Sequence, residues 1–147
     1  MAFIPYSHQS GVLAPWVWLP AGDATWAVGK AAVVVSGKCE PVASGVGEDT
    51  DEGVHYIAMF SETIPASADG AVRPFLLASA AGLVFETHLG EVAGTAVTGH
   101  RYLIHTDGVS ITDEATSKGV FQIIDMDGTT QGDKVRGIFI EHVDELA

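Results

Sequence analysis

The sequence feature that most constrains the fold is a regular succession of short strand-like runs separated by turn-forming residues. Runs of valine, isoleucine and aromatic residues recur roughly every 8–12 residues, a spacing typical of β-sandwiches and barrels. The dipeptides Ser36-Gly37, Asp107-Gly108 and Asp127-Gly128 stand between such runs and favour tight turns. No window of about 11 residues keeps an apolar stripe at helical spacing. The pattern therefore predicts an all-β protein, an antiparallel β-sandwich or barrel.

The expected strands follow from β-branched and aromatic runs between turn signals. The main ones cover residues 31–35, 38–42, 54–60, 71–77, 83–88, 101–106, 109–112, 119–125 and 134–142. Pro74 lies inside one of these runs, and proline lacks the N–H that a central strand donates. We therefore expect this strand at a sheet edge.

The N-terminal residues 1–24 have a different character. They contain Pro5, Pro15 and Pro20, a spacing that no helix tolerates, so we expect an extended arm followed by a β domain at 25–147. The large side chains of the arm either pack on the core of the domain or contact a partner. The residues that we assign to partner binding are Phe3, Ile4, Tyr6, Trp16 and Trp18.

The two halves of the β domain resemble each other, which suggests an internal repeat over residues 26–77 and 95–142. The matched segments begin at Ala27 and Ala96, at Gly53 and Gly119, and at Val72 and Val135, with offsets of 69, 66 and 63 residues. One four-strand meander cannot bury its apolar face alone, whereas two can. Chance similarity is the alternative, because alternating valine and glycine is common in β proteins.

Composition and charge exclude several function classes. The chain has 147 residues and a formal net charge of −12, which argues against nucleic acid and anionic membranes as partners. Its single cysteine, Cys39, excludes an internal disulfide framework. We find no signal peptide or membrane-spanning run, so we expect the cytoplasm of the producing cell or a particle assembled there.

No catalytic or metal-binding motif stands out. There is no nucleophile elbow, phosphate loop or dinucleotide fingerprint, so we predict neither an enzyme nor a cofactor. We interpret Cys39 as a small buried residue. The acidic clusters, 48–52 and Asp125 to Asp133, do not match a calcium loop. The histidines lack metal-ligand spacing, although a site assembled from distant histidines stays possible; they are His8, His55, His88, His100, His105 and His142.

Several phrases along residues 26–142 resemble those of a known group of structural proteins. A strand ending in Ala27-Val-Gly-Lys30 is followed by runs that begin Gly53-Val-His-Tyr and Gly119-Val-Phe-Gln. The chain then closes on Gly132-Asp-Lys-Val-Arg-Gly-Ile-Phe-Ile140. This succession is similar to the decoration or cement proteins of tailed bacteriophage heads.

The resemblance implies a non-enzymatic virion protein that binds the outside of the capsid. Such a protein bridges neighbouring major capsid subunits, often as a homo-oligomer, typically a trimer, and many grip the capsid with an extended arm. It would occupy the host cytoplasm before assembly. The alternatives are a small-ligand or carbohydrate-binding β-barrel, a metal-dependent β-barrel enzyme and another phage head or tail component.

Overall fold

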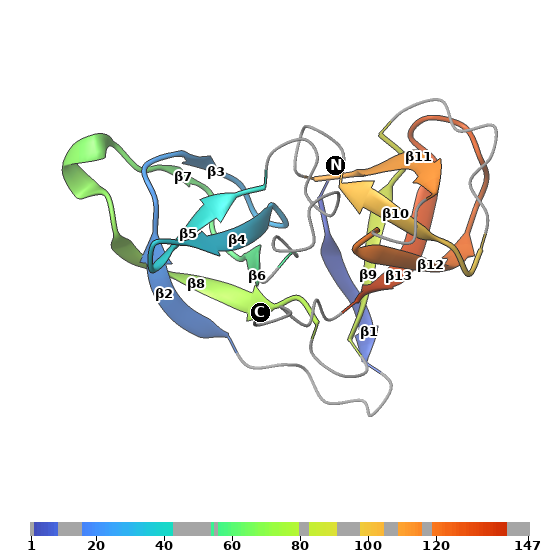
Figure 1. The fold of residues 1–147 in the computed structure, drawn as a ribbon, viewed down its shortest axis with the longest axis horizontal. Coiled ribbons are helices and arrows are strands. Elements are labelled where there is room, and N and C mark those ends of the chain that lie inside the picture. The colour runs from blue at the N-terminus through green and yellow to red at the C-terminus, as the bar shows by residue number, and fades with distance from the viewer. Residues whose placement is uncertain are drawn as a thin grey trace, which may run out of the picture.

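The computed structural model describes residues 2–8, 16–42, 54, 56–79, 83–90, 98–104, 109–115 and 119–140. Within these ranges the chain is all-β, and the only helical element is a 3₁₀ turn at Ala66–Ala68. This confirms the predicted fold class. Figure 1 shows two groups of strands, one on each side of the molecule.

The first group is a closed five-stranded barrel with the strand order β2-β5-β4-β6-β8, which we call the N-terminal barrel. Its strands are β2 (Val17–Ala21), β4 (Ala31–Val35), β5 (Lys38–Pro41), β6 (Tyr56–Ala58) and β8 (Ala71–Leu77). The parallel pairing of β2 and β5 closes the barrel through the single residue pair Ala21 and Cys39. A two-stranded sheet of β3 (Thr25–Trp26) and β7 (Glu62–Thr63) accompanies it.

Pro74 occupies an interior strand of this barrel, so the expected edge position is wrong. Strand β8 pairs with β2 on one side and with β6 on the other. The last pair between β6 and β8 is Ala58 with Phe75, and the Pro74 carbonyl accepts a hydrogen bond from Met59 N–H. Proline is tolerated because β6 ends beside it, where the ladder no longer requires an N–H.

The second group is a six-stranded sheet with the order β1-β9-β13-β12-β10-β11. Its strands are β1 (Ile4–His8), β9 (Leu83–His88), β10 (Arg101–Ile104), β11 (Ile111–Ala115), β12 (Phe121–Met126) and β13 (Lys134–Phe139). A parallel bridge between Leu89 and Ile111 brings the end of β9 against β11. We call β9 to β13 the C-terminal sheet, and β1 is added to its edge.

Apart from β1, the two groups repeat one topology. Strands β2, β4, β5, β6 and β8 correspond in order and pairing to β9, β10, β11, β12 and β13. Three pairs of equivalent glycine N–H groups donate equivalent hydrogen bonds. Gly22 donates to Cys39 O (2.8 Å) as Gly90 does to Ile111 O (2.9 Å), and Gly29 donates to Ala58 O as Gly99 does to Ile123 O (both 2.7 Å). Likewise, Gly70 donates to Ala21 O (2.9 Å) as Gly132 does to Leu89 O (2.8 Å). The last two glycine pairs share positive φ angles between 85° and 91°.

The strand registers show which residues are equivalent. Offsets of 70, 65 and 62 residues relate Ala32 to Tyr102, Tyr56 to Phe121 and Leu77 to Phe139. The offsets expected from the sequence were each one residue away from these. In a strand, a slip of one residue reverses the face, so the matching Val-Arg letters of β8 and β13 are not structural counterparts.

Two apolar clusters form the core. The smaller one fills the N-terminal barrel around Trp26 and Phe75, whose rings lie 5.5 Å apart. The larger one fills the C-terminal sheet and also includes Ala31, Val33 and Ile57 of the barrel. Because these three residues belong to barrel strands, the larger cluster joins the two groups, while the smaller one belongs to the barrel side.

The described parts of the segment 1–24 include two strands that are paired inside the fold. Strand β1 runs antiparallel to β9, and β2 runs antiparallel to β8 over five residue pairs. The N–H of Phe3 also donates to the carbonyl of Gly29 at 2.9 Å. The N-terminus therefore supplies one strand to each group instead of a separate arm.

Candidate interaction surface

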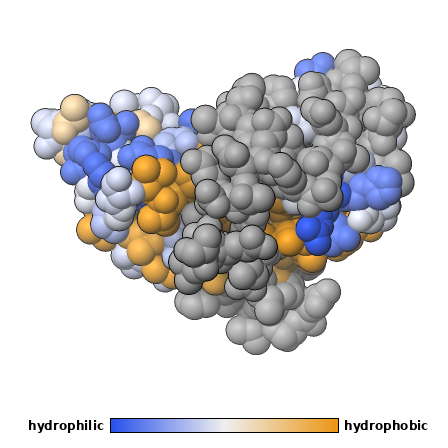
Figure 2. All heavy atoms as spheres, in the orientation of Figure 1, coloured by the Kyte–Doolittle hydropathy of each residue, from blue (hydrophilic) through white to orange (hydrophobic). Residues whose placement is uncertain are grey.

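Large exposed apolar side chains gather on the N-terminal barrel, on β2, β4 and β8 and just before β2. We call this set the apolar surface: Trp16, Val17, Trp18, Val34, Val35, Val72 and Leu77. Their exposed fractions run from 37% for Val17 to 62% for Trp18. In Figure 2 the apolar atoms of the left part of the molecule, where the barrel lies in Figure 1, gather on its lower side, and its upper side is mostly hydrophilic. Strand alternation divides this set: Trp16, Trp18, Val35 and Val72 point outward, whereas Val17, Val34 and Leu77 lie on the alternate, inward-facing side at the end of the barrel. Exposed apolar side chains that lie together mark interaction surfaces.

The register of β2 and β8 explains how this surface forms. Trp18 lies opposite Pro74, and Pro20 lies opposite Val72, so these side chains share one face. The alternate residues Leu19 and Ala21 pack into the barrel core. Trp16, Trp18 and Val72 therefore project from the outside of the barrel.

Phe3 does not belong to any exposed surface, which corrects its assignment to partner binding. Its side chain is fully buried. Its ring lies 5.0 Å from that of Phe139 and 5.5 Å from that of Phe121, both tilted. Phe3 is a core residue of the C-terminal sheet.

Ile4 and Tyr6 are exposed, but they lie on β1 rather than beside the tryptophans. The Tyr6 ring lies 5.1 Å from the guanidinium carbon of Arg136, a cation–π contact. Arg136 also binds Glu86, Asp125 and Asp127 at 3.0, 2.7 and 3.0 Å. The structure thus separates the five predicted residues: Phe3 is buried, Ile4 and Tyr6 lie on β1, and Trp16 and Trp18 lie at the start of β2.

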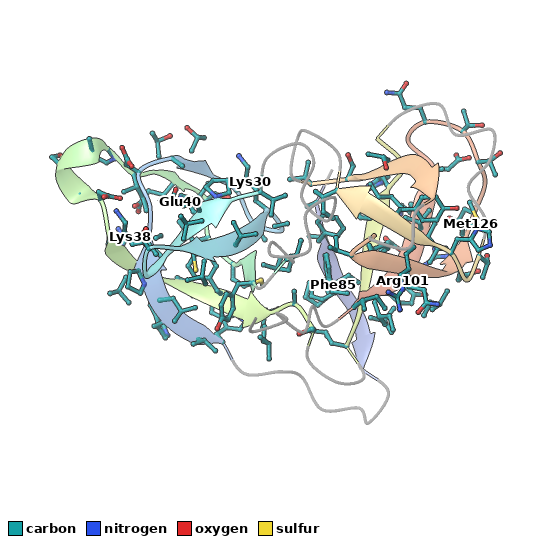
Figure 3. The ribbon with its side chains drawn as sticks, in the orientation of Figure 1. Lys30, Lys38, Glu40, Phe85, Arg101 and Met126 are labelled. Atoms are coloured by element: carbon teal, nitrogen blue, oxygen red, sulfur yellow. The ribbon has the colours of Figure 1, made fainter. Side chains whose placement is uncertain are left out.

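A small cavity of about 190 Å³ opens between β2 and β5. Its lining comes from both strands and from β4 and β6: Leu19, Pro20, Val34, Gly37, Lys38, Cys39 and Tyr56. Lys38 stands at the start of β5 (Figure 3) and forms an ion pair with Asp69. This pair raises the pKa of Lys38 and lowers the pKa of Asp69. The lining is thus mostly apolar, with one charged group that is already paired.

Cys39 lies in this cavity wall and is buried, in agreement with the prediction. Burial raises the pKa of its thiol to about 11, with a smaller contribution from Glu40. The thiol is therefore protonated at neutral pH and is a poor nucleophile.

The predicted acidic and histidine positions form no metal site within the described ranges, which contain no cluster of three or more metal-ligating side chains. The first acidic cluster and His55, His105 and His142 lie outside those ranges, as does the His8 side chain. Asp125 and Asp127 bind Arg136 instead of a cation.

His88 is half-buried, and its Nδ1 has no hydrogen-bond partner among the described residues. Burial, then the N-terminal charge and Lys134, lower its pKa below 6.5. His100 is exposed. Neither histidine belongs to a group of three or more metal-ligating side chains among the described residues.

The apolar surface was only partly found from the sequence. Trp16 and Trp18 were identified from their type, whereas Val34, Val72 and Leu77 were expected to be ordinary strand residues. Their pairing across strands distant in the sequence brings them to one barrel, and no local pattern carries that information.

None of the described segments forms a helix long and apolar enough to cross a membrane. No protein-family model matches the sequence, and no curated protein is significantly similar to it.

Proposed function

We propose that this chain is a non-enzymatic virion protein that binds the outside of a bacteriophage capsid and stabilises contacts between major capsid subunits. The observation that carries the proposal is the apolar surface of the barrel, with Trp16 and Trp18 at 53% and 62% exposure. Exposed tryptophans on a rigid sheet are typical anchors of protein interfaces.

At this surface we favour a protein partner over a small ligand in the adjoining cavity. Ligand pockets usually enclose about 300–1,000 Å³. The cavity between β2 and β5 is smaller, at about 190 Å³, and its one charged group, Lys38, is paired with Asp69. The exposed tryptophan side chains project outside this cavity, where a flat protein surface reaches them.

Self-association is part of the proposal, and we propose a trimer on the capsid exterior after folding in the host cytoplasm. The net charge of −12 opposes contacts between free copies, since like charges repel. A capsid surface with basic groups offsets this repulsion, so assembly on the shell is favoured over assembly in solution.

Co-sedimentation with expanded capsids tests the proposal, using the major capsid protein of the genome that encodes this chain. We expect saturable binding by the wild-type chain. The double variant Trp16→Ala/Trp18→Ala should bind about 30-fold more weakly, as the loss of roughly 2 kcal/mol at an interface anchor implies.

Ile124→Ala is the matched control, because Ile124 is 45% exposed but lies on β12 of the C-terminal sheet. It should bind like the wild type. A wild-type chain that stays in the supernatant at every capsid concentration contradicts the proposal.

A further inference from the structure

The two repeated groups differ beside their first strands, which are β9 in the C-terminal sheet and β2 in the N-terminal barrel. In the C-terminal sheet the end beside β9 is closed by β1, which pairs through Ile4 with Glu86 and through Pro5 with Phe85. The Phe3 ring, just before β1, packs on Phe121 and Phe139. A short extended segment with one aromatic side chain therefore closes this end.

The equivalent end of the N-terminal barrel lacks such a cover among the described residues. Tyr56 and Leu77 occupy the positions of Phe121 and Phe139. Leu77 is 41% exposed, whereas Phe139 is 4% exposed. Tyr56 is half-buried, whereas Phe121 is fully buried.

Two further equivalent pairs show the same contrast. Val34 is 44% exposed, and its counterpart Ile104 is 1% exposed. Val17 is 37% exposed, and its counterpart Phe85 is buried. The difference thus extends along β2, β4 and β8, where an added segment would lie.

The backbone of β2 is also suited to an added strand. Its Gly22 N–H side faces Cys39 of β5, and the two strands pair only at Ala21. Because backbone groups alternate along a strand, the N–H and C=O of Trp18 face the same side as the Gly22 N–H, and Pro20, which has no N–H, offers only its carbonyl there. Strand β5 begins only at Lys38, after the turn at Ser36-Gly37. Within the described segments it therefore pairs with β2 at Ala21 but not at Trp18.

The neighbouring cavity has room for a side chain. It holds about 190 Å³ and reaches Tyr56, the counterpart of one ring that Phe3 contacts. A cavity of roughly 150 Å³ accommodates a benzene molecule. An aromatic or large aliphatic side chain therefore fits.

We propose that this end of the barrel accepts one extended segment of the capsid protein, which pairs antiparallel with β2 and places a large apolar side chain beside Tyr56 and Leu77. The inference rests on the proposed function, since it assigns the segment to the capsid. The net charge of −12 favours a segment with basic flanking residues. Strand addition supplies backbone hydrogen bonds, and the inserted side chain supplies specificity.

A second copy of this chain fits this end less well. Inside the molecule, Ala31 and Ile57 of the barrel pack in the same cluster as Phe3. Their counterparts on the C-terminal sheet are Arg101 and Gln122, which are polar, and Arg101 is exposed (Figure 3). A copy stacked in the same manner would bring these polar groups against apolar side chains.

Nuclear magnetic resonance with a peptide tests the acceptor site on the full-length chain. The probe is a capped peptide of residues 2–8, because this segment closes the equivalent end. We expect saturable shifts at Val17, Val34 and Leu77, with Ile104 and Phe139 unchanged because tethered β1 already covers them. A peptide with Phe3→Ala should bind at least about tenfold more weakly.

Leu77→Asp should abolish peptide binding, and Ile124→Asp is the control with similar exposure on the other sheet. The inference is overturned if no shifts occur at millimolar peptide, or if Ile104 and Phe139 shift instead. It is also overturned if Val34 and Leu77 shift with protein concentration alone, which would assign this end to a second copy.

Capsid co-sedimentation of Leu77→Asp separates this inference from the proposed function. Wild-type capsid binding that Leu77→Asp leaves unchanged would contradict the acceptor site and leave the function standing. Peptide binding without any capsid binding would contradict the function and overturn the assignment of the segment to the capsid. Peptide binding together with at least a tenfold loss of capsid binding supports both.

Discussion

The N-terminal barrel and the C-terminal sheet use the same strand order but treat their ends differently. In the C-terminal sheet, β1 covers the end, and Phe85, Phe121 and Phe139 are buried there. In the barrel, the equivalent Val17 and Leu77 are exposed. One repeated unit is thus completed by a strand of its own chain, and its counterpart presents the same kind of end to the outside.

This difference shows that a repeated topology need not repeat a role. The completed end buries aromatic rings and stabilises the shared core. The exposed end leaves apolar side chains in water, so they contribute little to the stability of the free protein, and a partner that covers them would gain their burial energy.

The largest expected effect on stability comes from removing the Phe3 ring, which helps to close the end of the C-terminal sheet. Phe3→Ala should lower the free energy of unfolding by about 3–5 kcal/mol, because it leaves a cavity among buried rings. Leu77→Ala, at the equivalent exposed end, should cost about 1 kcal/mol or less. Urea unfolding measures both, and equal costs would contradict the difference between the ends.

A second comparison uses two equivalent glycines with positive φ. Gly29→Ala places a Cβ 2.5 Å from that of Ala2, whereas a Cβ at Gly99 meets nothing within 4 Å. Gly99→Ala should cost about 1 kcal/mol through backbone strain alone. Gly29→Ala should cost about 1–3 kcal/mol more, because the N-terminal segment must shift.

Urea unfolding of the two glycine variants gives this difference directly. A Gly29→Ala cost no greater than that of Gly99→Ala would mean that the N-terminal segment is not packed against the barrel as described.

Removing the exposed tryptophans should change stability little. Trp16→Ala/Trp18→Ala should alter the free energy of unfolding by no more than about 1 kcal/mol, because both side chains are more than half exposed. Thermal unfolding of the isolated chain measures this. A sharp drop in the melting temperature would place these residues in the core and remove the apolar surface from the account.

The smallest effect concerns pH, because a single half-buried side chain titrates. Burial lowers the pKa of His88 in the folded chain, while the unfolded chain keeps a pKa near 6.5. Below pH 6.5 the unfolded state therefore binds more protons, and stability falls as the pH falls. His88→Gln should reduce this slope in urea unfolding at several pH values. An unchanged slope would contradict the role of His88.

The sequence predicted the fold class and most strand positions because alternating β-branched runs and turn dipeptides are local signals. The run 71–77 coincides with β8, and 83–88 coincides with β9. The pairing of β1 with β9 was not predictable, since it joins residues about 80 positions apart that no local pattern relates.

The sequence contains a marker for the correct register of the repeat, but matching identical residues led to a register that is wrong by one residue. Gly70 and Gly132 both have positive φ and donate equivalent hydrogen bonds, which gives the observed offset of 62 residues. Matching Val72-Arg73 to Val135-Arg136 gave 63. Glycines that the backbone requires are more reliable markers than apolar letters, which recur in every strand.

Only the part of the candidate site that depends on residue type was predictable. Trp16 and Trp18 stood out because large aromatic side chains anchor interfaces. Phe3 has the same type, yet it is buried, because β1 pairs with a strand from the opposite half of the chain. Exposure depends on this tertiary pairing.

The most direct test of the central claim is a cryo-electron microscopy reconstruction of capsids decorated with this chain. We expect density for a capsid strand antiparallel to β2, with a large side chain between Tyr56 and Leu77. A bound chain whose barrel end beside β2 faces solvent would contradict it.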